Sequence, residues 1–213
     1  MTGHITTALT EAGLAGCVAW LVQTDTDLAH VVARHGSPPL WARPAGFPTL
    51  VHIILEQQVS LASARAAYDK LLLAAGTLTP ERFLAFSGEE LKIIGFSRQK
   101  TAYCRGLAEQ IVVGHFNIEQ LAEMEDGHAR ARLIAMKGIG PWTADIYLLM
   151  ALLRPDIWPT GDLALISAMQ SVKRLPARPK PDEMLEFAMP WRPYRAVAAR
   201  ILWHAYLSGY PDK

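Results

Sequence analysis

The sequence predicts an all-α protein. Residues that start and stop helices recur along the whole chain of 213 residues, whereas the alternation of apolar and polar residues that is typical of strands is nearly absent. Apolar residues make up 51% of the composition and charged residues 19%, which excludes disordered and low-complexity proteins. We therefore expect about ten helices, folded as one domain or as two closely joined lobes.

The helices can be placed by their capping residues. Residues 1–46 have a helical pattern, and the apolar spacing between Pro48 and Ala75 is also helical. Gln57-Gln58-Val59-Ser60 interrupts that spacing, which predicts two helices joined by a tight bend. The other expected helices run from Asp25 to Gly36, from Thr79-Pro80 onward, from Ser87 (a capping box with Glu90) to Gly95, from Ser97 to Gly114, from Asn117 (with Gln120) onward, and from Pro193 to Gly209.

Composition also limits the function. Cys17 and Cys104 are isolated, which excludes a disulfide framework, a structural zinc site and an iron–sulfur cluster, so we expect no cofactor and no metal. The longest apolar run, Ile146 to Leu153, is too short to cross a membrane, and the first twenty residues do not resemble a signal peptide. We expect a soluble, cytoplasmic protein.

Basic residues are unevenly distributed. The net charge is only +1, which favours no class of partner, but residues 91–108 and 127–144 contain Lys and Arg and no acid. Such stretches are either solvated helix faces or parts of a surface that binds a polyanion.

The segment from Leu133 to Leu165 contains a helical hairpin. One short helix ends in Lys137-Gly138-Ile139-Gly140, and Pro141 starts the next helix. Glycines at both corners allow a positive φ and a close approach of the backbone. The amides at the start of the second helix can bind a phosphate oxygen, although a plain tight turn has the same pattern.

Asp162 lies at the start of another expected helix. It follows Pro159-Thr160-Gly161 and precedes the helix Leu163 to Lys173, so its local role is that of a helix cap.

These segments resemble the helix-hairpin-helix (HhH-GPD) DNA glycosylases, and most closely the bacterial 3-methyladenine DNA glycosylase II type. The resemblance covers roughly Phe47 to Tyr210. It rests on FPTLVHIILEQQVS at 47–60, IIGFSRQK at 93–100, KGIGPWTAD at 137–145, WPTGDLAL at 158–165 and PWRPYR at 190–195. It implies two helical lobes, 1–46 plus about 155–213 and about 47–154, around a DNA-binding cleft.

The resemblance also implies roles for single residues. Asp162 matches the family's catalytic aspartate, which stabilises the positive charge that develops on the deoxyribose as the base leaves. Trp142 occupies the place of the lysine that forms a Schiff base in bifunctional members, which implies a monofunctional enzyme. Trp203 matches a second aromatic of the substrate pocket. Both tryptophans have core packing as their alternative role.

The implied DNA contacts lie in two segments. Gln57 or Gln58 fills the gap that a flipped nucleotide leaves, and the sequence does not distinguish between them. The hairpin residues that we expect at the DNA are Lys137, Gly138, Ile139, Gly140 and Thr143.

The expected function is removal of alkylated bases, of the 3-methyladenine and 7-methylguanine type, from double-stranded DNA by a monomer at the bacterial nucleoid. Two alternatives are a glycosylase for an oxidised, deaminated or mispaired base and a non-catalytic helix-hairpin-helix DNA-binding protein. Asp162 counts against the second alternative, because a carboxylate that faces DNA weakens binding.

Overall fold

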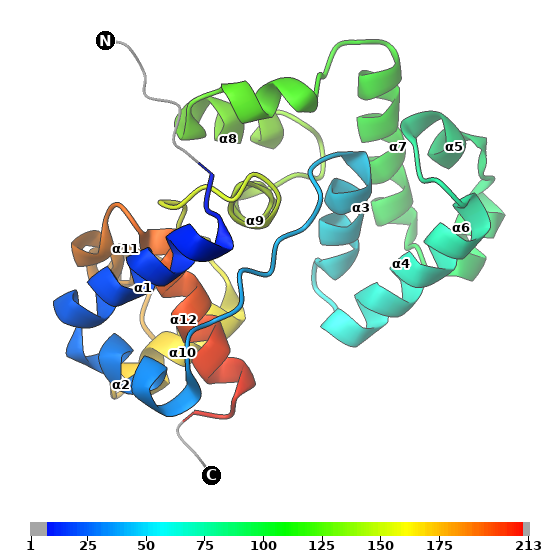
Figure 1. Ribbon diagram of the computed structural model, residues 1–213. Coiled ribbons are helices and arrows are strands. Elements are labelled where there is room, and N and C mark those ends of the chain that lie inside the picture. The colour runs from blue at the N-terminus through cyan, green and yellow to red at the C-terminus, as the bar shows by residue number, and fades with distance from the viewer. Residues whose placement is uncertain (1–7, 211–213) are drawn as a thin grey trace. The chain divides into compact units, whose positions relative to one another are not determined.

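The computed structural model describes residues 8–210, and this part of the chain is all-helical (Figure 1). It contains twelve α-helices and two short 3-10 helices, and the described residues form no strand. The predicted fold class is confirmed.

The chain divides into two compact units. The first contains Arg43–Tyr147, and the second contains residues 8–42 together with 148–210. The chain crosses between the units at 42/43, in a loop that contains prolines, and at 147/148, within a helix.

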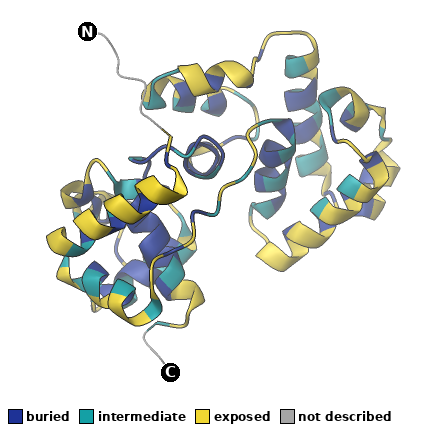
Figure 2. Cartoon of the chain, in the orientation of Figure 1, coloured by how far each residue is buried: buried dark blue, intermediate teal, exposed yellow. Residues whose placement is uncertain are grey.

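The first unit is built around α3, the most thoroughly buried of its helices (Figure 2). Phe47 of α3 packs edge-to-face on Phe83, whose ring in turn contacts Phe96. The helices are α3 (Phe47–Glu56), α4 (Leu61–Ala75), α5 (Pro80–Ala85), α6 (Gly88–Ile94), α7 (Arg98–Val112), η1 (Glu119–Glu123), α8 (Asp126–Ile134) and the greater part of α9 (Pro141–Met150).

The second unit surrounds α12, whose residues 196–203 are all buried. Arg200 is fully buried there, and its guanidinium donates to the carbonyls of Leu40 (2.9 Å), Ala196 (3.0 Å) and Leu149 (2.8 Å). Burial lowers the pKa of Arg200 to about 10. The helices are α1 (Glu11–Thr24), α2 (Thr26–His35), α10 (Leu163–Val172), α11 (Pro181–Ala188), η2 (Met189–Trp191) and α12 (Arg195–Leu207).

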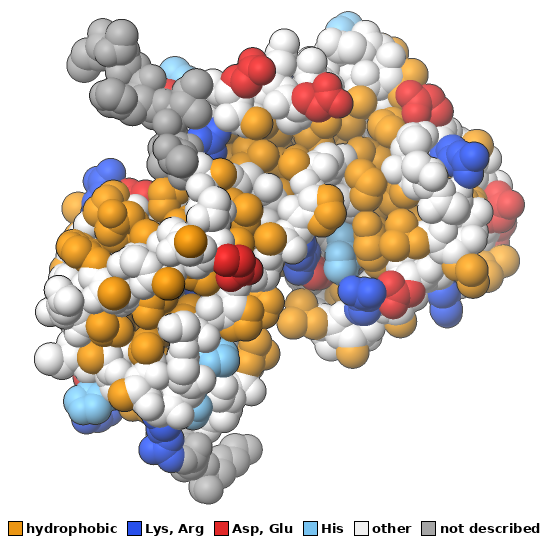
Figure 3. Space-filling view, viewed as in Figure 1, with side chains coloured by type: hydrophobic (Ala, Val, Ile, Leu, Met, Phe, Trp, Pro, Cys, Tyr) orange, Lys and Arg blue, Asp and Glu red, His pale blue; other side chains and the backbone are white. Residues whose placement is uncertain are grey.

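The visible face carries mixed side chains. In Figure 3, Lys and Arg side chains are scattered, several of them next to Asp or Glu, and do not form one continuous basic patch. Within residues 8–210, no helix combines the length and the apolar character needed to cross a bilayer.

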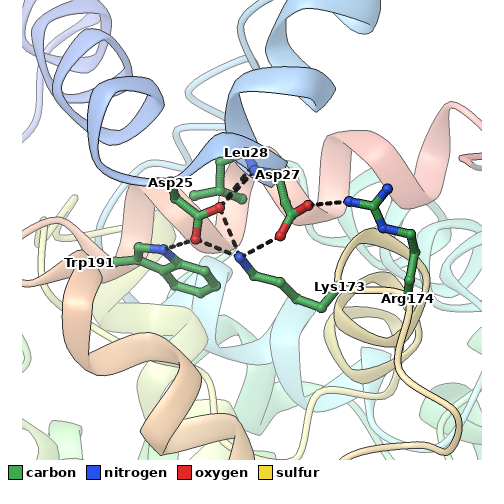
Figure 4. A network of polar contacts seen from close by, with 6 residues as sticks. All are labelled: Asp25, Asp27, Leu28, Lys173, Arg174 and Trp191. Atoms are coloured by element: carbon green, nitrogen blue, oxygen red, sulfur yellow. Dashed lines mark hydrogen bonds and ion pairs between the residues drawn. The ribbon is translucent and has the colours of Figure 1, made fainter.

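A partly buried polar network fastens α2 within the second unit (Figure 4). Asp25 caps α2 by accepting from the amides of Asp27 and Leu28, as its sequence position predicts. The same carboxylate accepts from Lys173 Nζ at 2.6 Å and from Trp191 Nε1 at 2.8 Å. One side chain thereby joins the start of α2 to the end of α10 and to η2.

Most of the expected helix starts are confirmed. Ser60, Thr79, Ser87 and Ser97 each accept a backbone amide of the first turn of the helix that follows, and the Ser87–Glu90 capping box is complete. The bend between α3 and α4 lies where Gln57 to Ser60 predict it.

Three expected elements differ from the structure. Asn117 accepts from the amides of Glu119 and Gln120, but this turn leads only into the 3-10 helix η1, because Met124 is extended. Residues 36–46 are not helical, since prolines there lack the amide that a helix needs. The last helix begins at Arg195 and not at Pro193, because Tyr194 has a non-helical backbone.

Candidate functional site

The hairpin between α8 and α9 depends on Gly138. Its φ of 93° is unfavourable for other residues, and a Cβ at this position would lie 2.2 Å from Cγ of Tyr103 on α7. Gly140 differs, because its φ is not positive and a Cβ there would have no neighbour within 4 Å. Of the two glycines that allow a positive φ, Gly138 therefore uses it and Gly140, which is exposed, does not.

The start of α9 offers backbone donors. The helix's internal hydrogen bonds begin with the amide of Ala144, which donates to the carbonyl of Gly140 at 3.0 Å. Amides before Ala144 have no carbonyl acceptor within the helix, which makes this end suitable for an anion. Ile139 offers no such donor, because its amide already donates to the carbonyl of Met136, and the residue is only 3% exposed. Lys137, by contrast, is exposed at the hairpin.

An ion pair braces the two helices of the hairpin. Arg130 on α8 donates to both carboxylate oxygens of Asp145 on α9, at 2.6 and 3.2 Å. Asp145 is almost fully buried. The last residue of the KGIGPWTAD motif thus has a structural role, because it fixes the angle at which α9 leaves the hairpin.

The bend between α3 and α4 contacts this hairpin. Gln57 Nε2 donates to the carbonyl of Gly138 and to the hydroxyl of Thr143, both at 2.9 Å. Gln58 is exposed and has a left-handed backbone with a φ of 57°. The two glutamines that the sequence left equivalent therefore have different environments.

Most basic residues of the two acid-free stretches bind other parts of the protein. Lys100 Nζ donates to the carbonyl of Leu55 at 2.7 Å, and Arg105 donates to the carbonyl of Phe86. Arg132 donates to the carbonyl of His115 at 3.2 Å. These side chains stabilise helix ends and loops, so the stretches are not simply a cationic surface.

Asp162 is held by two donors in the second unit. It caps α10, as predicted, by accepting from the amide of Leu165 at 2.8 Å. The same oxygen accepts from Nε1 of Trp203 on α12 at 3.1 Å. Trp203 is 7% exposed, so its ring packs in the core while its N–H fixes the carboxylate.

Trp142 lies in the first turn of α9 and is half-buried. It is the second residue after Gly140, where the sequence places it, and its side chain carries no amine.

The comparison with protein families decides the identity of the fold. Residues 51–193 match the family described as the HhH-GPD superfamily base excision DNA repair protein. The chain belongs to the HhH-GPD superfamily. The family that the five motifs predicted is confirmed.

Individual HhH-GPD relatives are named for one lesion type. The chain is 28% identical to the DNA-3-methyladenine glycosylase of Bacillus subtilis, over 84% of this chain and 67% of that protein. It is 26% identical to DNA-3-methyladenine glycosylase 1 of Schizosaccharomyces pombe, over 94% of this chain and 89% of the relative. The chain spans about two thirds of the length of the Bacillus subtilis relatives that it matches.

A solved structure supports the same relationship. The 3-methyladenine DNA glycosylase Mag1 of Schizosaccharomyces pombe, in complex with abasic DNA, superposes with a TM-score of 0.83 at 25% identity. The match covers 88% of this chain and 95% of Mag1.

The structure adds HhH-GPD site features that sequence reasoning missed. Tyr103 packs against Gly138, and Trp203 donates to Asp162, but neither relation has a local signal because the partners are far apart in the chain. In the part of the chain that the structure describes, no three His, Cys, Asp or Glu side chains gather as a metal site.

Proposed function

We propose that this protein is a monofunctional DNA glycosylase that removes alkylated bases, of the 3-methyladenine and 7-methylguanine type, from double-stranded DNA. The observation that carries the proposal is Asp162, a carboxylate fixed by the Leu165 amide and the Trp203 indole at the position of the family's catalytic aspartate. The names of the relatives, and the abasic DNA bound by Mag1, support the substrate class.

The reaction breaks the bond between C1′ of the deoxyribose and a ring nitrogen of the base. The electron pair of this bond leaves with the base, and the sugar becomes oxocarbenium-like. Asp162 stabilises that positive charge, and a water molecule adds its oxygen to C1′ and gives up a proton. A base methylated on a ring nitrogen already carries a positive charge, so it leaves as a neutral molecule without a general acid.

The DNA contacts divide between two neighbouring segments of the first unit. The amides at the start of α9, with Gly140 and Lys137, bind backbone phosphates. Gln58, which is exposed and follows the hairpin-bound Gln57 in the chain, fills the gap left by the flipped nucleotide. Trp142 stacks on the electron-poor base.

A test of the function is incubation with methylated duplex DNA and identification of the released bases. We expect 3-methyladenine and 7-methylguanine to be released and the strand to stay intact until alkali is added. Release of no alkylated base, from a folded protein that binds the duplex, contradicts the proposal.

Treatment with borohydride tests the monofunctional mechanism. Because Trp142 supplies no amine, no imine forms and none can be trapped by reduction. A covalent protein–DNA adduct, or strand cleavage without alkali, would show a lyase activity instead.

The proposal also covers the oligomeric state of the protein and its location in the cell. We expect a monomer that works in the cytoplasm, on the DNA of the bacterial nucleoid. Sedimentation of the protein alone and with a duplex containing one abasic site tests the monomer, and a second copy on a single site contradicts it.

A further inference from the structure

We infer that Gln57 is a positioning residue that holds the gap-filling bend and the phosphate-binding hairpin at a fixed distance from each other. The inference rests on the proposed function, since it assigns a task to the same DNA-binding surface. It separates the roles of the two adjacent glutamines: Gln58 enters the DNA, and Gln57 stays within the protein.

The hydrogen bonds of Gln57 use its full donor capacity. A side-chain amide nitrogen carries two hydrogens, and both are engaged, one by the Gly138 carbonyl and one by the Thr143 hydroxyl. A carbonyl oxygen can only accept, so the nitrogen of the amide must face Gly138. Thr143 is 2% exposed, so its hydroxyl would lose this donor at a place that is almost closed to solvent.

The contacts of Gln57 link both DNA-binding segments directly. Gln57 is the C-terminal cap of α3 and immediately precedes the left-handed Gln58. Gly138 is a corner of the hairpin, and Thr143 lies in the first turn of α9. One side chain therefore bridges the segment that fills the gap and the segment that binds phosphate.

Helix α7 supports both ends of this bridge. Lys100 donates to the Leu55 carbonyl in the last turn of α3, and the Tyr103 ring packs against the backbone of Gly138. The peptide of Gly138 is thereby held by the Tyr103 ring and by Gln57. These contacts hold Gln58 and the hairpin amides at a fixed spacing before DNA binds. Binding therefore does not carry the entropy cost of ordering these groups.

Positioning by Gln57 predicts a selective loss of affinity. Gln57→Met keeps the length of the side chain and removes both donors. We expect its affinity for a duplex with a tetrahydrofuran abasic site to fall about tenfold, equivalent to about 1.4 kcal/mol, and its affinity for the undamaged duplex to fall less than about threefold. The abasic duplex needs both segments at once, whereas the undamaged duplex needs only phosphate contacts.

A double-variant cycle distinguishes positioning from a separate contact. Gln58→Ala removes the gap-filling side chain and leaves the Gln57 bonds in place. We expect Gln58→Ala to weaken abasic binding in the wild type and to have little further effect in Gln57→Met. Fluorescence anisotropy measures all four affinities, and thermal melting confirms that the variants are folded.

The possible results distinguish failure of the inference from failure of the proposed function. Equal loss on both duplexes, full additivity with Gln58→Ala, or unchanged affinities each overturn the inference. If Gln57→Met does not fold, Thr143→Val removes one acceptor alone and should show the same selectivity with a smaller loss, of about threefold. A wild-type protein that shows no preference for abasic DNA contradicts the proposed function and the inference together, whereas a preference that Gln57→Met retains contradicts the inference alone.

Discussion

At the scale of single residues, Asp162 has a cap role and a proposed catalytic role, and one substitution can separate them. Asp162→Asn keeps an oxygen that accepts from the Leu165 amide and the Trp203 indole, so the cap of α10 remains. It removes the charge that, in the proposed mechanism, stabilises the sugar in the transition state. We expect base release under single-turnover conditions to fall at least about 100-fold, with DNA affinity and melting temperature little changed.

The matched control is Asp182→Asn, which changes an exposed carboxylate in the first turn of α11. We expect this variant to excise like the wild type. If Asp162→Asn also excises within about threefold of the wild type, Asp162 is only a helix cap.

Residues also show where sequence reasoning reaches its limit. The cap by Asp162 was predictable because a cap is a relation between residues three apart. Its bond to Trp203 spans 41 residues and depends on how α10 and α12 pack, so no local pattern contains it. The same reason explains why the different environments of Gln57 and Gln58 became visible only in the fold.

At the scale of elements, the hairpin allows a clean test of phosphate binding at Gly140. Gly138 is unsuitable, since any side chain there collides with Tyr103. Gly140→Glu places a side chain in open space and adds a negative charge where we propose a phosphate. We expect affinity for damaged and undamaged duplexes to fall by a similar factor, more than about tenfold, because phosphate contacts carry no lesion information.

Gly88→Glu is the control for this change. Gly88 is exposed at the start of another helix, α6, and also has no neighbour within 4 Å of its missing Cβ. Anisotropy titrations should show wild-type affinity for Gly88→Glu. Wild-type affinity in Gly140→Glu would place the phosphates elsewhere.

The Asp25 network predicts how elements of the second unit respond to pH. Burial alone would raise the pKa of Asp25, but hydrogen bonds from Lys173, Trp191 and the Leu28 amide lower it below its ordinary value. The unfolded chain therefore binds the proton more readily, and the stabilisation is present above the unfolded pKa of about 3.9 and lost as pH falls through the lower folded value. We expect Asp25→Asn to destabilise the protein by about 2 kcal/mol at pH 7.

This difference should shrink as pH falls from about 4 through the lower folded pKa of Asp25, because the unfolded chain takes up the proton first and the folded carboxylate takes it up only at lower pH. Denaturant unfolding across this range measures it. The control, Asp69→Asn, breaks an exposed pair with Arg65 and should cost little at any pH. An Asp25→Asn difference that stays constant down to pH 2 would show that the charge is irrelevant to the network.

At the scale of the whole molecule, the sequence predicted the fold class, the family and most of the helix starts that it named. It placed the lobe boundaries at 46/47 and about 154/155, and the structure divides into compact units at 42/43 and 147/148. The second boundary lies inside α9, whose apolar residues continue without a break from one unit into the next. Proline and glycine mark chain reversals, and a boundary within a continuous helix contains neither.

The function of the whole molecule predicts which bases leave fastest. Bases methylated at ring nitrogens carry a positive charge and are good leaving groups, so one carboxylate and an aromatic face suffice for them. In the proposed site, cation–π attraction to Trp142 contributes roughly 0.5 to 2 kcal/mol. This attraction needs no exact hydrogen-bond geometry, so it accepts several lesions. We expect 3-methyladenine and 7-methylguanine to be excised faster than hypoxanthine or 8-oxoguanine, and Trp142→Ala to narrow the difference. Single-turnover assays on matched duplexes, each with one lesion, measure these excision rates. Faster release of a neutral lesion would mean that selectivity depends on hydrogen bonds to the base and not on the charge of the base.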